Sequence, residues 1–253
     1  MPVPVTPKTE AQLLEVFSSI QGEGLLIGCR QIFLRFALCN LDCSYCDTPF
    51  APADDCRIED APGSGQFRTL PNPVSLETLT NILSAWCGKI PGLHHSISLT
   101  GGEPLVQLSS LLDWVPALAE ILPLHLETNG TLPDALEPLL PHLEWISMDI
   151  KLASMSGTPT PWQAHSNFLA LARDRNCLVK VVVGEETAPR EVENAARMVH
   201  EVGPDVPLIL QPVTRDGRVG FPARALLDLQ ERAAQIHPHL RVIPQTHQFM
   251  GLL

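Results

Sequence analysis

The sequence predicts an α/β protein built on a partial (β/α) barrel of about six to seven parallel strands. Short β-rich runs alternate with amphipathic helical segments from about residue 30 onward, which is typical of a parallel sheet with crossover helices. The 253 residues suit one large domain, and 45% hydrophobic with 18% charged residues is a globular composition. We therefore expect a single domain over residues 1–253.

Seven runs are predicted as strands, several of them apolar on both faces, as buried parallel strands often are. They are Gln31 to Ala37, Ser96 to Thr100, Leu124 to Glu127, Trp145 to Ile150, Leu178 to Val183, Pro207 to Gln211 and Leu240 to Pro244. Seven strands favour a partial barrel over eight closed strands.

Helices are predicted between the strands at recognisable start signals. Ser75 is a suitable cap for a helix that ends near Gly88, and Pro189 stands in the first turn of another helix. Residues 51–73 are rich in Pro, Gly and Asp and show no sustained period, so an irregular loop insertion is expected there.

Charge and composition exclude several classes of function. A formal net charge of −11 without a basic stretch argues against nucleic acid as a partner. No run approaches the roughly 18 apolar residues that cross a bilayer, so we expect no membrane association and a cytoplasmic location. Seven cysteines are too sparse for a disulfide scaffold and fit a reducing compartment.

Three of these cysteines form the most informative motif. Cys39, Cys43 and Cys46 follow a predicted strand with C-x3-C-x2-C spacing. Three thiolates on one short loop suit a four-iron four-sulfur cluster whose fourth iron stays open for a substrate. The alternative is a structural zinc site completed by Cys29, Cys56 or a histidine, although the second C-x2-C pair usual for such sites is missing.

Polar residues follow four further predicted strands. They occur in "TGGEP" at Thr100, "ETNGT" at Glu127, "DIK" at Asp149 and "QPV" at Gln211. Because the carboxyl ends of parallel strands meet at one edge of a sheet, these groups are expected to converge with the cysteine loop on one pocket.

The cysteine spacing and the "TGGEP" element resemble the radical S-adenosylmethionine superfamily. This resemblance implies that S-adenosylmethionine binds to the open iron. It assigns S-adenosylmethionine contacts to the backbone beside Tyr45 and Asp47 and to Gly102, Glu103, Thr128, Asp149, Lys151 and Gln211.

Within the superfamily, "FSSIQGEG", "IFLRFALCNLDCSYCDTPF" and the ending "PQTHQFMGLL" resemble the 7-carboxy-7-deazaguanine synthase family. That family converts 6-carboxy-5,6,7,8-tetrahydropterin to 7-carboxy-7-deazaguanine, with loss of ammonia, on the route to queuosine-type deazapurines. The resemblance covers nearly the whole chain apart from residues 51–73. "SMDIK" departs from the family's commoner Ser-Pro-Lys, which affects the individual nucleoside contacts.

The resemblance also implies a substrate pocket. Arg35 presents a planar fork suited to a carboxylate, and Gln21 and Glu23 suit the donor and acceptor edge of a pterin. The full set implied for the substrate is Ile20, Gln21, Gly22, Glu23, Arg35, Thr100, Glu127, His247 and the C-terminal carboxylate of Leu253.

The remaining expectations concern metal and partners. Thr48 matches the family's magnesium-binding threonine, and one protein ligand is sufficient for Mg²⁺ when substrate and water complete its octahedron. The family also implies a flavodoxin or ferredoxin as electron donor and a homodimer.

Two other functions stay open at this stage. A glycyl-radical-enzyme activase would explain the cluster and "TGGEP" but leaves "IQGEG", Arg35 and the "QTH" ending unexplained. A non-catalytic iron-sulfur or zinc scaffold would bind metal without cleaving S-adenosylmethionine.

Overall fold

The computed structural model describes residues 9–46, 49–215 and 217–252, except for the side chain of Arg215. Within them, a ten-stranded sheet has the order β14-β11-β10-β9-β8-β7-β3-β2-β4-β5. Its first seven strands in this order all run parallel to one another, and β3, the seventh, pairs antiparallel with β2 (Leu13–Ile20) on its other side. They are β3 (Arg30–Phe36), β7 (Ser96–Gly101), β8 (Leu124–Thr128), β9 (Trp145–Ile150), β10 (Asn176–Val183), β11 (Leu208–Pro212) and β14 (Leu240–Val242).

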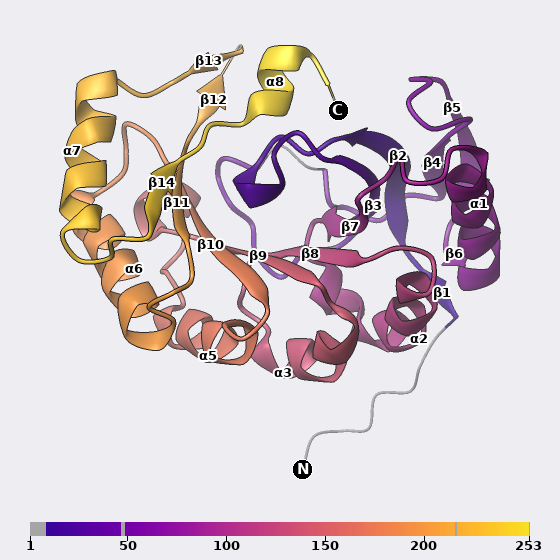
Figure 1. The fold of residues 1–253 in the computed structure, drawn as a ribbon, viewed down its shortest axis with the longest axis horizontal. Coiled ribbons are helices and arrows are strands. Elements are labelled where there is room, and N and C mark those ends of the chain that lie inside the picture. Colours follow the sequence, from indigo (N-terminus) through magenta and orange to yellow (C-terminus); the bar gives the residue numbers. More distant parts are fainter. Residues whose placement is uncertain (1–8, 47–48, 216, 253) are drawn as a thin grey trace.

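Figure 1 shows this sheet curved into an open arc, with helices along its outer side. The partial barrel and the seven predicted strands are therefore confirmed. The helices are α1 (Leu76–Lys89), α2 (Leu108–Ala119), α3 (Pro133–Leu136), α4 (Ala153–Ser156), α5 (Trp162–Ala172), α6 (Pro189–Val202), α7 (Ala223–Ala234) and α8 (Thr246–Met250). Short 3-10 turns are η1 (Gly24–Leu26), η2 (Pro104–Gln107) and η3 (Glu137–His142).

Both predicted helix starts are confirmed. The Ser75 hydroxyl accepts a hydrogen bond from the Thr78 amide at 3.2 Å, which satisfies one of the free N–H groups of α1. Pro189 is the first residue of α6, where its missing N–H removes no helical hydrogen bond.

The expected irregular loop at residues 51–73 is corrected by the structure. It contains β4 (Asp55–Glu59) and β5 (Phe67–Pro71), an antiparallel hairpin that extends the sheet through β2 (Leu13–Ile20). Its short strands and Pro-rich, Gly-rich flanks conceal the pattern in the sequence. Other short strands are β1 (Glu10–Ala11), β6 (Val74–Ser75), β12 (Thr214–Arg215) and β13 (Arg218–Val219).

The two faces of the central strands differ, which corrects the expectation that they are apolar on both. Alternate residues such as Leu99, Leu126 and Met148 are fully buried in the core. The residues between them, including Glu127 and Asp149, line a cavity on the inner side of the arc. Because side chains alternate along a strand, every second position is left for the site.

No helix in the described ranges is long and apolar enough to cross a membrane.

Candidate active site

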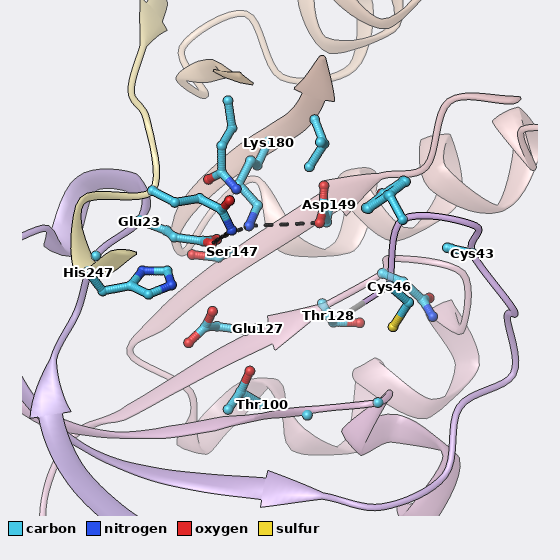
Figure 2. A pocket seen from close by; sticks show the side chains of 18 of the residues that line it. Glu23, Cys43, Cys46, Thr100, Glu127, Thr128, Ser147, Asp149, Lys180 and His247 are labelled. Carbon is cyan, nitrogen blue, oxygen red and sulfur yellow. Dashed lines mark hydrogen bonds and ion pairs between the residues drawn. The ribbon is translucent and has the colours of Figure 1, made fainter. Parts of the chain in front are cut away.

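The inner side of the arc encloses a cavity of about 610 Å³. Figure 2 shows Cys43 and Cys46 at one end, His247 at the other, and the strand residues Thr100, Glu127, Ser147 and Asp149 between them. The predicted convergence of strand-end residues with the cysteine loop is therefore present in the structure.

The cysteine loop is held by three neighbouring segments. The Ser44 hydroxyl donates to the Met155 carbonyl at 2.7 Å, which ties the loop to α4. The side-chain amide of Asn129 donates to the Asn40 side-chain oxygen at 2.8 Å. The backbone N–H of Glu103 donates to the Leu38 carbonyl at 2.8 Å. These bonds fix the thiols of Cys39, Cys43 and Cys46 at the cavity wall.

Gly102 is required by the close approach of the loop. A Cβ atom at this position would lie 2.0 Å from the Leu38 carbonyl oxygen, far inside contact distance. Leu38 itself has a φ of 69°, an uncommon left-handed conformation directly before Cys39. The sharp entry into the cysteine loop thus depends on a glycine on the neighbouring strand end.

Glu103 lies beneath the cavity wall and does not line it. Its carboxylate accepts from the backbone N–H of Asn129 at 2.7 Å, the Thr128 hydroxyl at 2.9 Å and the backbone N–H of Leu105 at 3.1 Å. Burial raises the pKa of Glu103 to about 7, although the three hydrogen bonds oppose the shift. In this structure the carboxylate holds the Thr128 to Asn129 turn in place.

Asp149 lies between two lysines. Its Oδ2 accepts from Lys151 at 2.6 Å and lies 3.8 Å from the ammonium of Lys180. Among the residues that the structure describes, its buried Oδ1 has no hydrogen-bond partner, and neither has the buried Oε1 of Gln211. Two unsatisfied acceptors at the cavity wall indicate that a ligand with hydrogen-bond donors belongs there.

Lys180 also forms an ion pair with Glu23, whose Oε1 accepts from Gln245 at 2.8 Å. Burial alone would raise the pKa of the Glu23 carboxyl, but Lys180 and Gln245 lower it to about 2. Burial would lower the pKa of Lys180, and Glu23 and Asp149 raise it instead. Both groups of the pair are therefore charged at neutral pH.

Glu127 and Gln21 form the floor of the cavity. Glu127 Oε1 accepts from the Ser98 hydroxyl at 2.5 Å and from the Gln21 amide at 3.1 Å. The Glu127 Oε2 has no hydrogen-bond partner within the described residues. An acceptor therefore faces the cavity from the middle of the sheet.

Arg35 is already paired inside the protein. Its Nε donates to Glu15 at 2.8 Å, and its guanidinium lies 5.6 Å from the centre of the Phe17 ring. These contacts fix the plane of the fork while Arg35 still lines the cavity. The remaining donors on its terminal nitrogens suit a carboxylate.

The C-terminal segment borders one end of the cavity and packs on the loop that carries Gln21. The Thr246 amide donates to the Gly22 carbonyl at 2.9 Å. A Cβ at Gly22 would lie 2.5 Å from the backbone nitrogen of His247, so only glycine allows this packing. His247 and Gln248 thereby reach the cavity.

Most of the predicted site residues lie together. The cavity lining includes Ile20, Gln21, Gly22, Glu23, Arg35, Cys39, Cys43, Tyr45, Cys46, Thr100, Gly102, Glu127, Thr128, Asp149, Lys151, Gln211 and His247. Glu103 is the exception described above. Asp47, Thr48 and Leu253 lie outside the described residues.

Sequence reasoning missed Lys180, Ser147 and Gln245. A signal existed for two of them. Lys180 is a lone charge inside an apolar strand, the same feature that drew attention to Arg35. Ser147 precedes Asp149 by two residues and so shares its face of the strand.

Comparison with known proteins identifies the superfamily of this chain. Residues 35–204 match the Radical SAM superfamily. Because the match spans more than half of the chain, the chain belongs to this superfamily. Two solved structures share the fold: QueE from Escherichia coli, at TM-score 0.59 and 20% identity over 94% of this chain and 95% of that one, and Streptococcus suis SuiB bound to precursor peptide SuiA, at TM-score 0.55 and 13% identity over 95% of this chain and 49% of that one.

Curated relatives define the family more narrowly. A 7-carboxy-7-deazaguanine synthase from Geobacter sulfurreducens is 49% identical, covering 97% of this chain and 99% of its own length. The enzyme of the same name from Methanothermobacter thermautotrophicus is 35% identical, covering 96% and 98%. The chain belongs to the 7-carboxy-7-deazaguanine synthase family, which confirms the resemblance of its motifs.

Superfamily membership implies a four-iron four-sulfur cluster and S-adenosylmethionine, and the residues fit both. Burial raises the pKa of the Cys43 thiol, and the nearby Cys39 and Cys46 raise it further, so the thiolate is disfavoured here without a cation. Bound iron would stabilise the thiolate and remove this penalty. No three His, Cys, Asp or Glu side chains in the described ranges converge as they would around a single ion. A cubane cluster has no such need, because each thiolate binds a different iron.

The zinc alternative gains no support from the geometry. Neither Cys29 nor Cys56 lines the cavity with the cysteine loop, and no histidine in the described ranges joins the three cysteines in a group that could hold a single ion. Cys56 is fully buried in β4, and burial raises the pKa of its thiol to about 12.

Proposed function

We propose that this chain converts 6-carboxy-5,6,7,8-tetrahydropterin to 7-carboxy-7-deazaguanine with loss of ammonia. The observation that carries the proposal is a single cavity with three cysteines at one end and a set of carboxylate-binding and amide-binding groups at the other. Relatives that match over nearly their whole length are 7-carboxy-7-deazaguanine synthases, and their name supports the same product.

When bound, the cluster and S-adenosylmethionine would supply radical chemistry for hydrogen abstraction. Thr128, Asp149, Lys151 and Gln211 would hold the nucleoside and amino acid parts of S-adenosylmethionine, and the two unsatisfied acceptors would receive its N–H or O–H groups. Glu103 supports S-adenosylmethionine binding indirectly, because it holds the Thr128 to Asn129 turn in place.

The substrate lies between S-adenosylmethionine and the closing segment at His247. Arg35 donates to the substrate carboxylate, and Glu127 accepts from N–H groups of the pyrimidinone ring. Gln21 and the Glu23 to Lys180 ion pair hold the loop that covers the ring. Closure excludes water from the radical chemistry.

Three further parts complete the proposal. Mg²⁺ is held by Thr48 together with substrate oxygens and water. A flavodoxin or ferredoxin delivers the electron, and the chain acts as a homodimer. Light scattering of the reconstituted protein and omission of Mg²⁺ from the assay test two of these parts directly.

The activase function finds less support. An activase takes a protein segment as its substrate, whereas this cavity is bordered at one end by Gln245, His247 and Gln248 and lined with groups that suit a small polar ring.

The test is an anaerobic reconstitution with iron and sulfide, followed by reductant, Mg²⁺, S-adenosylmethionine and 6-carboxytetrahydropterin. Mass spectrometry should detect 7-carboxy-7-deazaguanine. Cys43→Ala should abolish it together with the iron content. Cys87→Ala is the matched control, since Cys87 lies on α1 and outside the cavity lining. Formation of 5′-deoxyadenosine alone would refute the substrate, and an intact cluster with neither product would favour a scaffold.

A further inference from the structure

Ser147 occupies the centre of the cavity wall. It lies on β9 in register with Glu127 on β8, and its side chain lies between Glu127 and the Glu23 to Lys180 pair (Figure 2). In the described part of the chain its hydroxyl has one hydrogen-bond partner, the Nε2 of His125 at 2.7 Å. The direction of that bond decides what Ser147 offers to a ligand.

The direction is set by a series of side-chain amides that begins at Gln21. The Gln21 Nε2 faces Glu127 Oε1 at 3.1 Å, and its Oε1 faces the backbone N–H of Glu23 at 3.0 Å. A carboxylate only accepts and a backbone N–H only donates, so the two ends of this amide have one possible assignment.

Gln31 follows from Gln21. The Gln21 Nε2 also donates to the Gln31 Oε1 at 3.0 Å, which leaves the Gln31 Nε2 facing Ser96 and the Nδ1 of His125, at 2.7 and 3.3 Å. A donor facing Nδ1 requires that nitrogen to be an acceptor. The proton of the neutral His125 ring is therefore on Nε2.

The Nε2–H of His125 donates to the Ser147 oxygen, so the hydroxyl proton of Ser147 is free to point elsewhere. His125 is almost completely buried. Burial also lowers the pKa of His125, which keeps the ring neutral at physiological pH.

We propose that Ser147 donates a hydrogen bond to the ring carbonyl oxygen of the substrate, and that His125 is the positioning residue that makes it a donor. This inference rests on the proposed function. It assigns Ser147 a role in specificity that complements Glu127, whose Oε1 is occupied by Ser98 and Gln21 while its Oε2 faces the cavity.

The pair matches one chemical group. A hydroxyl donor beside a carboxylate acceptor is complementary to a carbonyl beside an N–H, which is the lactam edge of a pterin. A 2,4-diaminopteridine carries an amino group where the pterin has its carbonyl, and this amino group would meet a donor. A donor on a cavity wall discriminates between such ligands, because only one of them presents it with an acceptor.

The test measures the binding of two probes to the reconstituted protein with S-adenosylmethionine and without reductant. The probes are 6-carboxypterin and 2,4-diaminopteridine-6-carboxylic acid, followed by their own fluorescence. Ser147→Ala should raise the Kd for 6-carboxypterin about tenfold and leave the Kd for the diamino compound unchanged or lower. Ser147→Thr, which keeps the hydroxyl, should restore the preference.

His125→Phe should reproduce the effect of Ser147→Ala, and the double variant should show no larger effect than either single one. Nitrogen NMR of ¹⁵N-histidine protein, with the His125 signal assigned by the variant, should show the Nε2–H tautomer. If His125→Phe fails to fold, the Ser147 variants still test whether Ser147 donates to the ligand. The tautomer is then measured on the wild type, and the His125 signal is assigned with His125→Asn.

The outcomes distinguish the proposed function of the chain from the role of Ser147. Wild-type protein that binds neither probe would contradict the proposed function. Two results would overturn the inference about Ser147 and leave the proposed function standing. One is an equal affinity of the wild type and Ser147→Ala for 6-carboxypterin. The other is the Nδ1–H tautomer at His125 in the wild type.

Discussion

Glu23 and Lys180 form a buried ion pair across 157 positions of sequence, joining the loop after β2 to the middle of β10. Asp149 lies 3.8 Å from the same lysine. One lysine thus connects the end of the cavity assigned to the pterin with the end assigned to S-adenosylmethionine, so that the two ligands share one charged framework.

Glu23→Gln should lower the free energy of unfolding by about 3 kcal/mol at pH 7, because Lys180 would stay buried without its main counterion. Chemical denaturation measures this change. The exposed helix pair of Arg224 and Asp228 is the control, since Arg224→Ala should cost less than about 1 kcal/mol. Equal costs for both variants would show that the buried pair has no special weight.

The same pair predicts a pH dependence. The pKa of Glu23 falls from 4.5 to about 2 on folding, so its contribution is complete above pH 4.5 and is lost as the pH falls toward 2. The stability difference between wild type and Glu23→Gln should therefore shrink on acidification. A stability difference that stays constant as the pH falls from about 5 to about 3, through the upper part of this pKa interval, would contradict this prediction.

Glu103 predicts the opposite trend. Its pKa rises from 4.5 to about 7 on folding, so the folded state holds a proton that the unfolded state releases, and stability falls as the pH rises through this interval. Wild type should lose up to about 3 kcal/mol relative to Glu103→Gln across this range. Parallel stability curves for the two proteins would show that the hydrogen bonds of Glu103 outweigh its burial.

Gly102→Ala should displace the cysteine loop, because the added Cβ would collide with the Leu38 carbonyl. We expect several-fold lower iron and sulfide content after reconstitution, with the helical circular dichroism signal retained. Gly88→Ala is the matched control, since a Cβ there meets nothing within 4 Å. Full cluster content in Gly102→Ala would mean that the loop moves without losing its ligand geometry.

Gln211→Leu should separate binding from stability. The buried Gln211 Oε1 has no hydrogen-bond partner within the described ranges, so its removal should leave the free energy of unfolding unchanged or higher in the absence of ligand. The Kd for S-adenosylmethionine, measured by calorimetry, should rise about tenfold. A loss of stability with unchanged affinity would reverse this assignment.

The sequence was sufficient to predict the parallel strands and many of the residues that line the cavity, because both depend on local signals. Cys39, Cys43 and Cys46 are close in the chain, and the groups at Thr100, Glu127 and Asp149 each follow a recognisable strand. The β4–β5 hairpin was missed because its short strands owe their order to pairing with β2.

Roles that depend on distant partners were also beyond the sequence. Glu103 carries the expected motif, but its three donors come from residues 105, 128 and 129, and their arrangement removes it from the cavity lining. The tautomer of His125 depends on the orientation of Gln21 and Gln31, which only the assembled sheet defines.

Because residues 245–248 stand late in the chain, they are translated after the cysteine loop and after the strands through β11. A chain that ends before them has its three cysteines but nothing to pack over Gly22. The contacts of Thr246 and His247 with Gly22 are therefore among the last tertiary contacts of the cavity that synthesis makes possible.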